Sequence, residues 1–239
     1  MALFNHIPQA SKSLRVLALL LSYPDAQQRA HLPDLRDALH AERALSASRL
    51  AELDALIATL GRKAVLEVEA EYVELFDRGR ATSLHLFEHV HGDSRDRGPA
   101  MIDLTKTYEQ AGLFLGEGEL PDFVPVVLEF ASTLEPRQAR EFLGEMAHIF
   151  NAIFNALQQR KSAYASALGA LLELSGEKAH AVKIAPDEAL DTAWAEPVVF
   201  DGCSVKGQAK TGQEQPIHFV RNETSSSRAN SPAHTGASL

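Results

Sequence analysis

The sequence predicts an all-α fold, a compact helical bundle with a largely disordered C-terminal tail. Apolar residues recur at spacings of three and four through most of the first 175 residues, which is the period of a helix with one buried face. No run of alternating apolar and polar residues is long enough for a central strand. Hydrophobic residues make up 45% of the 239-residue chain, enough to bury a core. We therefore expect an all-helical domain over residues 1–180 and a flexible tail over residues 181–239.

The first predicted helix carries an apolar stripe made of Leu14, Leu17, Ala18 and Leu21. An uninterrupted apolar run covers only residues 16–21, which is too short to cross a bilayer and short even for a secretion signal. The tripeptide at 23–25 is Tyr-Pro-Asp, where a signal would have a small-residue cleavage site. The stretch therefore predicts a buried helix, a cytoplasmic location and no direct insertion into a membrane.

Helical stripes continue along the chain. Three further stripes of apolar residues with helical spacing cover residues 50–60, 65–76 and 101–111. The first and the third are each followed by a glycine, which is typical of a helix end. Asp122 is a suitable N-cap for a further helix through Leu134, since its carboxylate can accept from the first free backbone amides.

The clearest stripe runs from Phe142 to Leu157 and keeps its spacing for more than four turns. Pro136 stands where a first-turn proline belongs, so a helix is predicted from there through Leu157. A last stripe over residues 164–172 is closed by Gly176.

The charge is unevenly distributed along the chain. The formal net charge is −9, and residues 204–239 hold four basic and two acidic residues, so that stretch is +2 and residues 1–203 are −11. Such an acidic body argues against a nucleic-acid partner, which is bound mainly through Lys and Arg. It leaves room for a basic or apolar peptide partner. A single cysteine, Cys203, excludes an intrachain disulfide and any Cys-rich metal site.

Two apolar islands interrupt the tail, at residues 194–200 around Trp194 and at residues 217–220. They are either stray hydrophobic residues in a flexible segment or, at 194–200, a segment that docks on the helical body. A lone tryptophan flanked by valine and phenylalanine has the chemistry of an anchor.

The charged connector, residues 76–99, is the most unusual part of the chain. It contains four arginines, four acidic residues and three histidines within 24 residues. One interpretation is that its charges pair with one another while Leu84 and Phe87 anchor it to the core. Exposed ion pairs of this kind stabilise a fold by only about 0–1 kcal/mol each, which leaves the density of arginine and histidine unexplained.

A second interpretation of the connector is a zinc metallopeptidase. His85, Glu88 and His89 match the H-x-x-E-H pattern, in which two imidazoles bind zinc and the carboxylate acts as base. That chemistry requires a stable helix facing a cleft and a third ligand from elsewhere, and no third ligand is evident. The other catalytic patterns, a phosphate-binding glycine loop and a G-x-S-x-G elbow, are absent.

Residues 72–101 closely resemble the signature of the nitrate reductase molybdenum-cofactor assembly chaperones, the NarJ type within the TorD/DmsD/NarJ group of redox-enzyme maturation proteins. Residues 120–130, Leu-Pro-Asp-Phe-Val-Pro-Val-Val-Leu-Glu-Phe, are similar to the second motif of that family. The resemblance covers roughly residues 11–175. Phe123 stands where much of the wider group has histidine, so no imidazole role is carried over to that position.

This resemblance implies a cytoplasmic, all-α chaperone that is not an enzyme and holds no metal or cofactor of its own. The implied partner is the apo catalytic (alpha) subunit of a membrane-bound respiratory nitrate reductase, bound through its N-terminal leader-like segment. The implied role is to support molybdenum cofactor insertion and complex assembly before membrane docking.

We hypothesise that a groove for the client peptide includes both motifs. Aromatic and apolar side chains would line it: Tyr72, Phe76, Leu84, Phe87 and Phe123. Acidic side chains would present charge to the leader: Glu88, Asp93, Asp122 and Glu129. Arg78 and Arg80 would orient the connector or touch the client. The connector histidines would make binding sensitive to pH between about 6 and 8: His85, His89 and His91. The alternative for the aromatic residues is an ordinary place in the core.

Overall fold

The computed structural model describes residues 8–92 and 94–182. These residues form eleven α-helices, one π-helical turn and one 3-10 turn, and within them the only β pairing is an isolated bridge between His85 and Phe123. The all-α prediction is confirmed. The predicted tail with its segment at 194–200 lies outside the described residues, as does Asp93, and the division at residue 180 stays a prediction.

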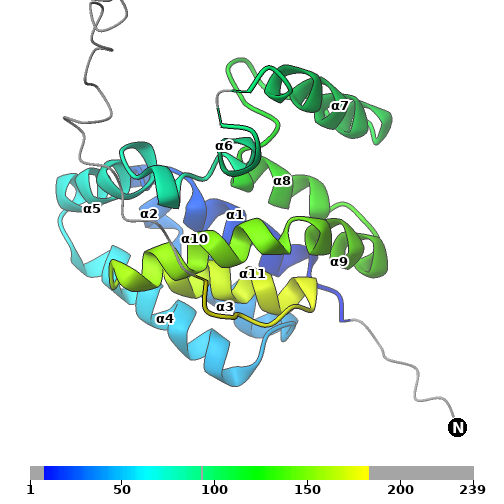
Figure 1. Ribbon diagram of the computed structural model, residues 1–239. Coiled ribbons are helices and arrows are strands. Elements are labelled where there is room, and N and C mark those ends of the chain that lie inside the picture. The colour runs from blue at the N-terminus through cyan, green and yellow to red at the C-terminus, as the bar shows by residue number, and fades with distance from the viewer. Residues whose placement is uncertain (1–7, 93, 183–239) are drawn as a thin grey trace, which may run out of the picture. The chain divides into compact units, whose positions relative to one another are not determined.

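The elements follow one another along the chain with short connections (Figure 1). In order they are α1 (Ser11–Leu21), α2 (Ala26–Ala30), α3 (Leu32–Glu42), α4 (Ala47–Arg62), α5 (Val65–Tyr72), η1 (Val73–Asp77), η2 (Arg80–Thr82), α6 (Leu86–Val90), α7 (Arg97–Gln110), α8 (Val124–Ala131), α9 (Pro136–Glu145), α10 (Ala147–Gln159) and α11 (Ala165–Ser175).

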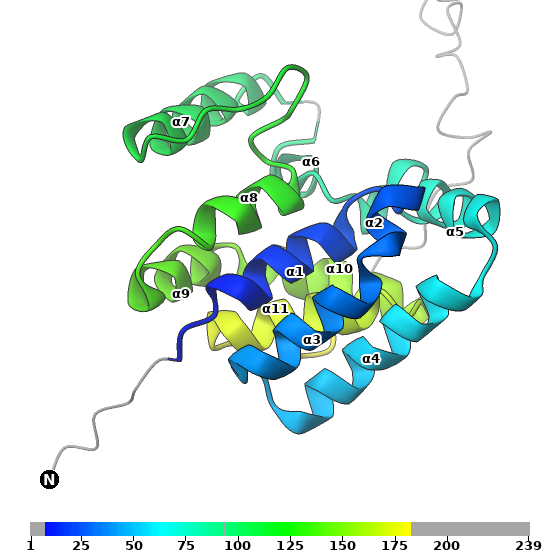
Figure 2. The same cartoon turned by 180° about the vertical axis from the view of Figure 1, so that it is seen from behind.

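Helix α1 is central to the bundle and packs against α3, α8 and α11 (Figure 2). Four of its five leucines are buried as a result, and Leu17, Leu20 and Leu21 are fully inaccessible to solvent, whereas Leu19 is 41% exposed. The apolar run near the N-terminus is therefore a core helix, as predicted. Among the described residues, no helix is both long enough and apolar enough to cross a membrane.

The stripe at 142–157 is divided between two helices, so the prediction of one continuous helix from Pro136 is wrong. Helix α9 ends at Glu145, Met146 has φ −97° and ψ −1°, and α10 begins at Ala147. The amide of Met146 donates to the carbonyl of Leu143 at 3.2 Å, which is a tighter turn than an α-helix makes. Gly144 lowers the helix propensity just before this break.

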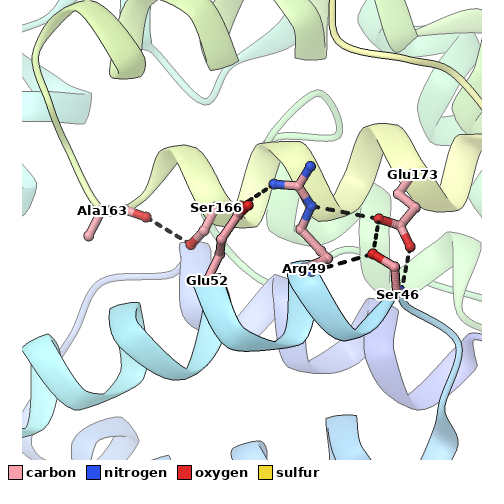
Figure 3. Close-up of polar contacts among 6 residues, drawn as sticks. All are labelled: Ser46, Arg49, Glu52, Ala163, Ser166 and Glu173. Carbon is pink, nitrogen blue, oxygen red and sulfur yellow. Dashed lines mark hydrogen bonds and ion pairs between the residues drawn. The ribbon is translucent and has the colours of Figure 1, made fainter.

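Helix α4 is tied to α11 at its first turn (Figure 3). The hydroxyl of Ser46 accepts from the amide of Arg49 at 3.4 Å, as an N-cap does. The carboxylate of Glu173 in α11 accepts from the Ser46 amide at 2.6 Å and from its hydroxyl at 3.0 Å. Arg49 lies beside this contact and is ion-paired with Glu52.

The stripe at 65–76 begins as α5 and continues as the π-helical turn η1. The amide of Arg78 donates to the carbonyl of Val73 at 3.1 Å, five residues earlier. The hydroxyl of Thr82 then donates to the carbonyls of Leu75 and Gly79, which closes the chain back onto the turn. Single π-helical turns are frequent at functional sites, and this one begins the charged connector.

Helix α7 lies apart from the other helices at one end of the bundle (Figure 1, Figure 2). Tyr108 is its buried residue: the hydroxyl donates to the carbonyl of Pro121 at 2.8 Å, and the ring lies 4.7 Å from that of Phe130. The helix is therefore held near its C-terminal end, which places the 111–123 segment beside the connector.

Candidate functional site

An open groove of about 500 Å³ lies where the end of α1, the turn η1, the start of α8 and the segments 84–85 and 118–123 meet. We call it the aromatic groove. Six of the residues predicted for the client site line it: Tyr72, Phe76, Leu84, His85, Phe123 and Glu129. The structure thus brings together residues of both sequence motifs, which are separated by more than thirty positions in the chain.

The floor of the groove is a cluster of aromatic rings. The ring centroids of Tyr72 and Phe76 are 4.8 Å apart, and Tyr164, the N-cap of α11, packs edge-on against both at 6.2 and 5.1 Å. The hydroxyl of Tyr72 donates to the carbonyl of Leu21 at 2.8 Å, which satisfies the C-terminal end of α1. Tyr72 and Phe76 are buried, so they belong to the core and also form the base of the groove. Burial raises the pKa of the Tyr72 and Tyr164 hydroxyls, so both stay protonated.

The two motifs are joined by backbone hydrogen bonds. The amide of Val124 donates to the carbonyl of Leu84 at 2.9 Å, and the amide of Leu86 donates to the carbonyl of Asp122 at 3.0 Å. The rings of His85 and Phe123 stack across this pairing with centroids 5.2 Å apart. One wall of the groove is therefore an imidazole and a phenyl ring held in a fixed register.

The position and contacts of the Asp122 side chain differ from those predicted from the sequence. It neither caps α8, whose N-cap is Phe123, nor reaches the surface, because its side chain is 0% exposed. One carboxylate oxygen accepts from the amide of Phe87 at 3.0 Å, and the other lies 3.5 Å from Nδ1 of His85. The expectation that Asp122 presents charge to a client is thus wrong, since its charge is directed at α6 and at His85.

The pKa of His85 responds to this arrangement. The carboxylate of Asp122 raises the pKa of the imidazole above its usual value, against the opposing effect of partial burial. Glu88 adds to the rise, and Arg97 opposes it.

Carboxylates form the rim of the groove. Asp77, Glu119 and Glu129 are exposed and line it. Partial burial raises the pKa of the Glu129 carboxyl, and the neighbouring charge of Glu119 adds to the rise. Above the raised pKa of Glu129 the rim is negative, which suits a cationic or neutral ligand over an anionic one.

The remaining predicted residues of the connector do not line the groove. Phe87 packs against the core and against the ring of His91 at 5.4 Å, and it does not line the aromatic groove. Nε2 of His89 lies 2.8 Å from the carbonyl oxygen of Ser83. Two more of the predicted residues form ion pairs: Glu88 with Arg97 at 3.6 Å, and Arg78 with Glu74 at 3.3 Å. Arg80 is exposed on η2 and has an interaction partner of its own.

The geometry of the H-x-x-E-H sequence gives the zinc peptidase alternative no support. His85 is the extended N-cap of α6, so it does not share a helical face with His89. Glu88 is directed toward Arg97, and the ring nitrogen of His89 is occupied by the Ser83 carbonyl. Across residues 8–92 and 94–182, no three His, Cys, Asp or Glu side chains are grouped so that they could hold a metal ion.

Several lining residues were not predicted: Tyr23, Glu119, Leu120, Pro125 and Val126. The ring of Tyr23 packs edge-on against Tyr72 at 5.6 Å, although the two are far apart in sequence. Three of the others could have been found from the sequence, because Leu120, Pro125 and Val126 belong to the second motif.

Comparison with known proteins decides the family. The family model described as "Nitrate reductase delta subunit" matches residues 25–169. The chain belongs to the nitrate reductase delta subunit family. Both groove-forming motifs of this delta subunit family member lie within the matched region.

Two similar proteins with known descriptions support this family assignment. The nitrate reductase molybdenum cofactor assembly chaperone NarJ of Escherichia coli K12 is 41% identical over 196 residues, which cover 78% of this chain and 83% of the relative. The probable chaperone of the same description from Bacillus subtilis, also called NarJ, is 34% identical over 158 residues, 65% of this chain and 84% of the relative. The resemblance seen in the sequence is confirmed.

A solved structure shares the fold. The crystal structure of a putative redox enzyme maturation protein from Archaeoglobus fulgidus superposes with a TM-score of 0.50 at 20% identity. It covers 74% of this chain and the whole of that one. At this level of identity the comparison supports the helical architecture alone.

Proposed function

We propose that this chain is a cytoplasmic assembly chaperone for a respiratory nitrate reductase. In this proposal it binds the apo form of the catalytic (alpha) subunit through that subunit's N-terminal leader-like segment. It keeps the subunit ready for molybdenum cofactor insertion and complex assembly before membrane docking, and it catalyses no reaction itself. The names of the relatives support the nitrate reductase as target.

The observation that carries the proposal is the composition of the aromatic groove. Its floor is aromatic, its rim is acidic, and both family motifs contribute to its walls. Its volume of about 500 Å³ suits a few side chains of a peptide. An amphipathic segment with basic and apolar residues would place its apolar side chains on the rings and its cations against Glu119 and Glu129.

The expected affinity is moderate. Ordering a flexible leader costs about 2–5 kcal/mol of the gross interaction energy, so release of the client needs no external energy source. The acidic body, at −11 over residues 1–203, mainly accelerates association with a basic segment and makes it dependent on salt.

Calorimetry with a synthetic peptide from the N-terminus of the catalytic subunit tests the proposal. The full chain should bind it, and a peptide of scrambled sequence should bind much more weakly. The double variant Glu119→Gln, Glu129→Gln should weaken binding by about tenfold, since two charge contacts at the rim are lost. Glu145→Gln, an exposed carboxyl on α9 outside the groove, is the matched control and should leave the affinity unchanged.

A further inference from the structure

A second cavity lies on another part of the bundle and has the opposite charge. It has a volume of about 390 Å³ and lies between α4, α9 and the C-terminal end of α11. Three cations line it, Arg49, Arg140 and Lys178, together with two carboxylates, Glu173 and Glu177. The local balance is one positive charge, in a body whose net charge is −11. We call it the arginine pocket.

Two glycines, Gly169 in α11 and Gly176 at its C-cap, leave the space that the guanidinium groups of Arg49 and Arg140 occupy. A Cβ on Gly169 would overlap the guanidinium of Arg49, and a Cβ on Gly176 would overlap that of Arg140. The two glycines are seven residues apart, which is about 10 Å along a helix. The guanidinium of Arg49 therefore lies against the backbone within α11, and that of Arg140 lies against the backbone at its C-terminal end.

Both arginines keep hydrogen-bonding capacity that the fold does not use. The side chain of Arg140 makes no hydrogen bond or ion pair within the described part of the chain. The guanidinium of Arg49 is ion-paired with Glu52 and, at 3.7 Å from its Nε, with Glu173, and that buried Nε makes no hydrogen bond (Figure 3). The Glu173 carboxylate is committed to the amide and hydroxyl of Ser46. The guanidinium of Arg140 is exposed and lines the pocket, so its donors are free to bind an oxyanion there.

We propose that the arginine pocket binds the diphosphate group of a small molecule. Guanidinium groups donate in pairs to phosphate oxygens, and their separation along α11 suits two linked phosphates better than one. The pocket volume lies within the range of small-molecule sites. The site is separate from the aromatic groove, with which it shares no lining residue.

Inorganic pyrophosphate is the probe that tests this site. Calorimetry on the full chain at fixed ionic strength should give saturable binding with a dissociation constant of about 1 mM or tighter. Inorganic phosphate should bind more weakly. Arg140→Gln should weaken pyrophosphate binding by about tenfold, because a charged donor pair is lost. Arg137→Gln, on the same helix but outside the pocket and paired with Glu141, is the control and should bind like the wild type.

A second variant leaves the number of charges unchanged. Gly169→Ala adds a methyl group where the Arg49 guanidinium lies, so the guanidinium must move while the helix gains a better helix former. The thermal unfolding temperature should stay the same or rise, and pyrophosphate affinity should fall. The proposal is overturned if pyrophosphate shows no saturable binding up to about 10 mM, or if Arg137→Gln and Arg140→Gln lower the affinity equally. Equal loss would mean that only general charge attraction is present.

Discussion

Nδ1 of His85 and a carboxylate oxygen of Asp122 face each other at 3.5 Å, and neither atom has another hydrogen-bond partner. The pair joins the charged connector to the second sequence motif across 37 positions of the chain. It also places a titratable group in the wall of the aromatic groove. Stability and client binding are therefore both expected to depend on the protonation of His85.

The effect on stability has a definite sign. Because Asp122 raises the pKa of His85, protonated His85 stabilises the fold, fully so below the ordinary histidine value of about 6.5, and this contribution is lost as the pH rises through the raised pKa. His85→Gln should therefore cost about 1 kcal/mol more at pH about 5.5 than at pH about 8.5. Urea unfolding at both pH values measures this. His31→Gln, which removes an exposed pair with Asp34, should show little such difference.

Client binding should respond in the opposite direction. Loss of the proton from His85 makes the groove more negative, so a basic peptide should bind more tightly as the pH rises from about 6 to 8. His85→Gln should flatten the profile. The double variant His89→Gln, His91→Gln should retain it, because neither residue lines the groove. A profile that is the same in the wild type and in His85→Gln would exclude His85 as the sensor.

Two tyrosines of the groove floor offer a matched pair of substitutions. The hydroxyl of Tyr72 donates to the Leu21 carbonyl, whereas the buried hydroxyl of Tyr164 has no hydrogen-bond partner. Tyr72→Phe should lower the free energy of unfolding by about 1–2 kcal/mol, since a buried carbonyl loses its donor. Tyr164→Phe should cost nothing or stabilise slightly. Chemical denaturation of both variants makes the comparison, and equal losses would contradict the assigned hydrogen bond.

Gly79 is required by packing at the start of the connector. A Cβ there would collide with the carbonyl oxygen of Leu75 and the hydroxyl of Thr82. Gly79→Ala should destabilise the fold by about 1–3 kcal/mol, as other overpacked sites do. Gly98→Ala adds its methyl group to open space on α7 and should be neutral or stabilising by up to about 1 kcal/mol. Thermal unfolding distinguishes them, and similar melting temperatures would refute the packing argument.

The helices were predictable because their periodicity is local. The stripe of α1 and the closure of α11 at Gly176 both follow from the order of residues along a few turns. The break at Met146 was not predictable, since the apolar spacing continues through it. Both helices pack on α11, and in addition α9 contacts α8 whereas α10 contacts η2. The place of each helix in the bundle depends on such contacts.

Only those residues of the aromatic groove that belong to the two sequence motifs were predictable. Tyr72 and Phe76 lie on one helical face and were expected together, and the resemblance linked them to Phe123. The role of Asp122 was not predictable, because its partners are the Phe87 amide and His85, more than thirty residues earlier. An aspartate before a helix has the local signature of an N-cap, and a tertiary contact overrides it here.

Site-specific photocrosslinking tests the central claim, that the aromatic groove binds the N-terminal segment of the apo catalytic subunit. A photoreactive phenylalanine replaces Leu120, which lines the groove and is 43% exposed, or as a control Leu66, which is 79% exposed on α5 outside it. With the apo catalytic subunit present, position 120 should crosslink to its first residues and position 66 should not. Crosslinks from position 66 alone, or from position 120 to other parts of the subunit only, would contradict the account.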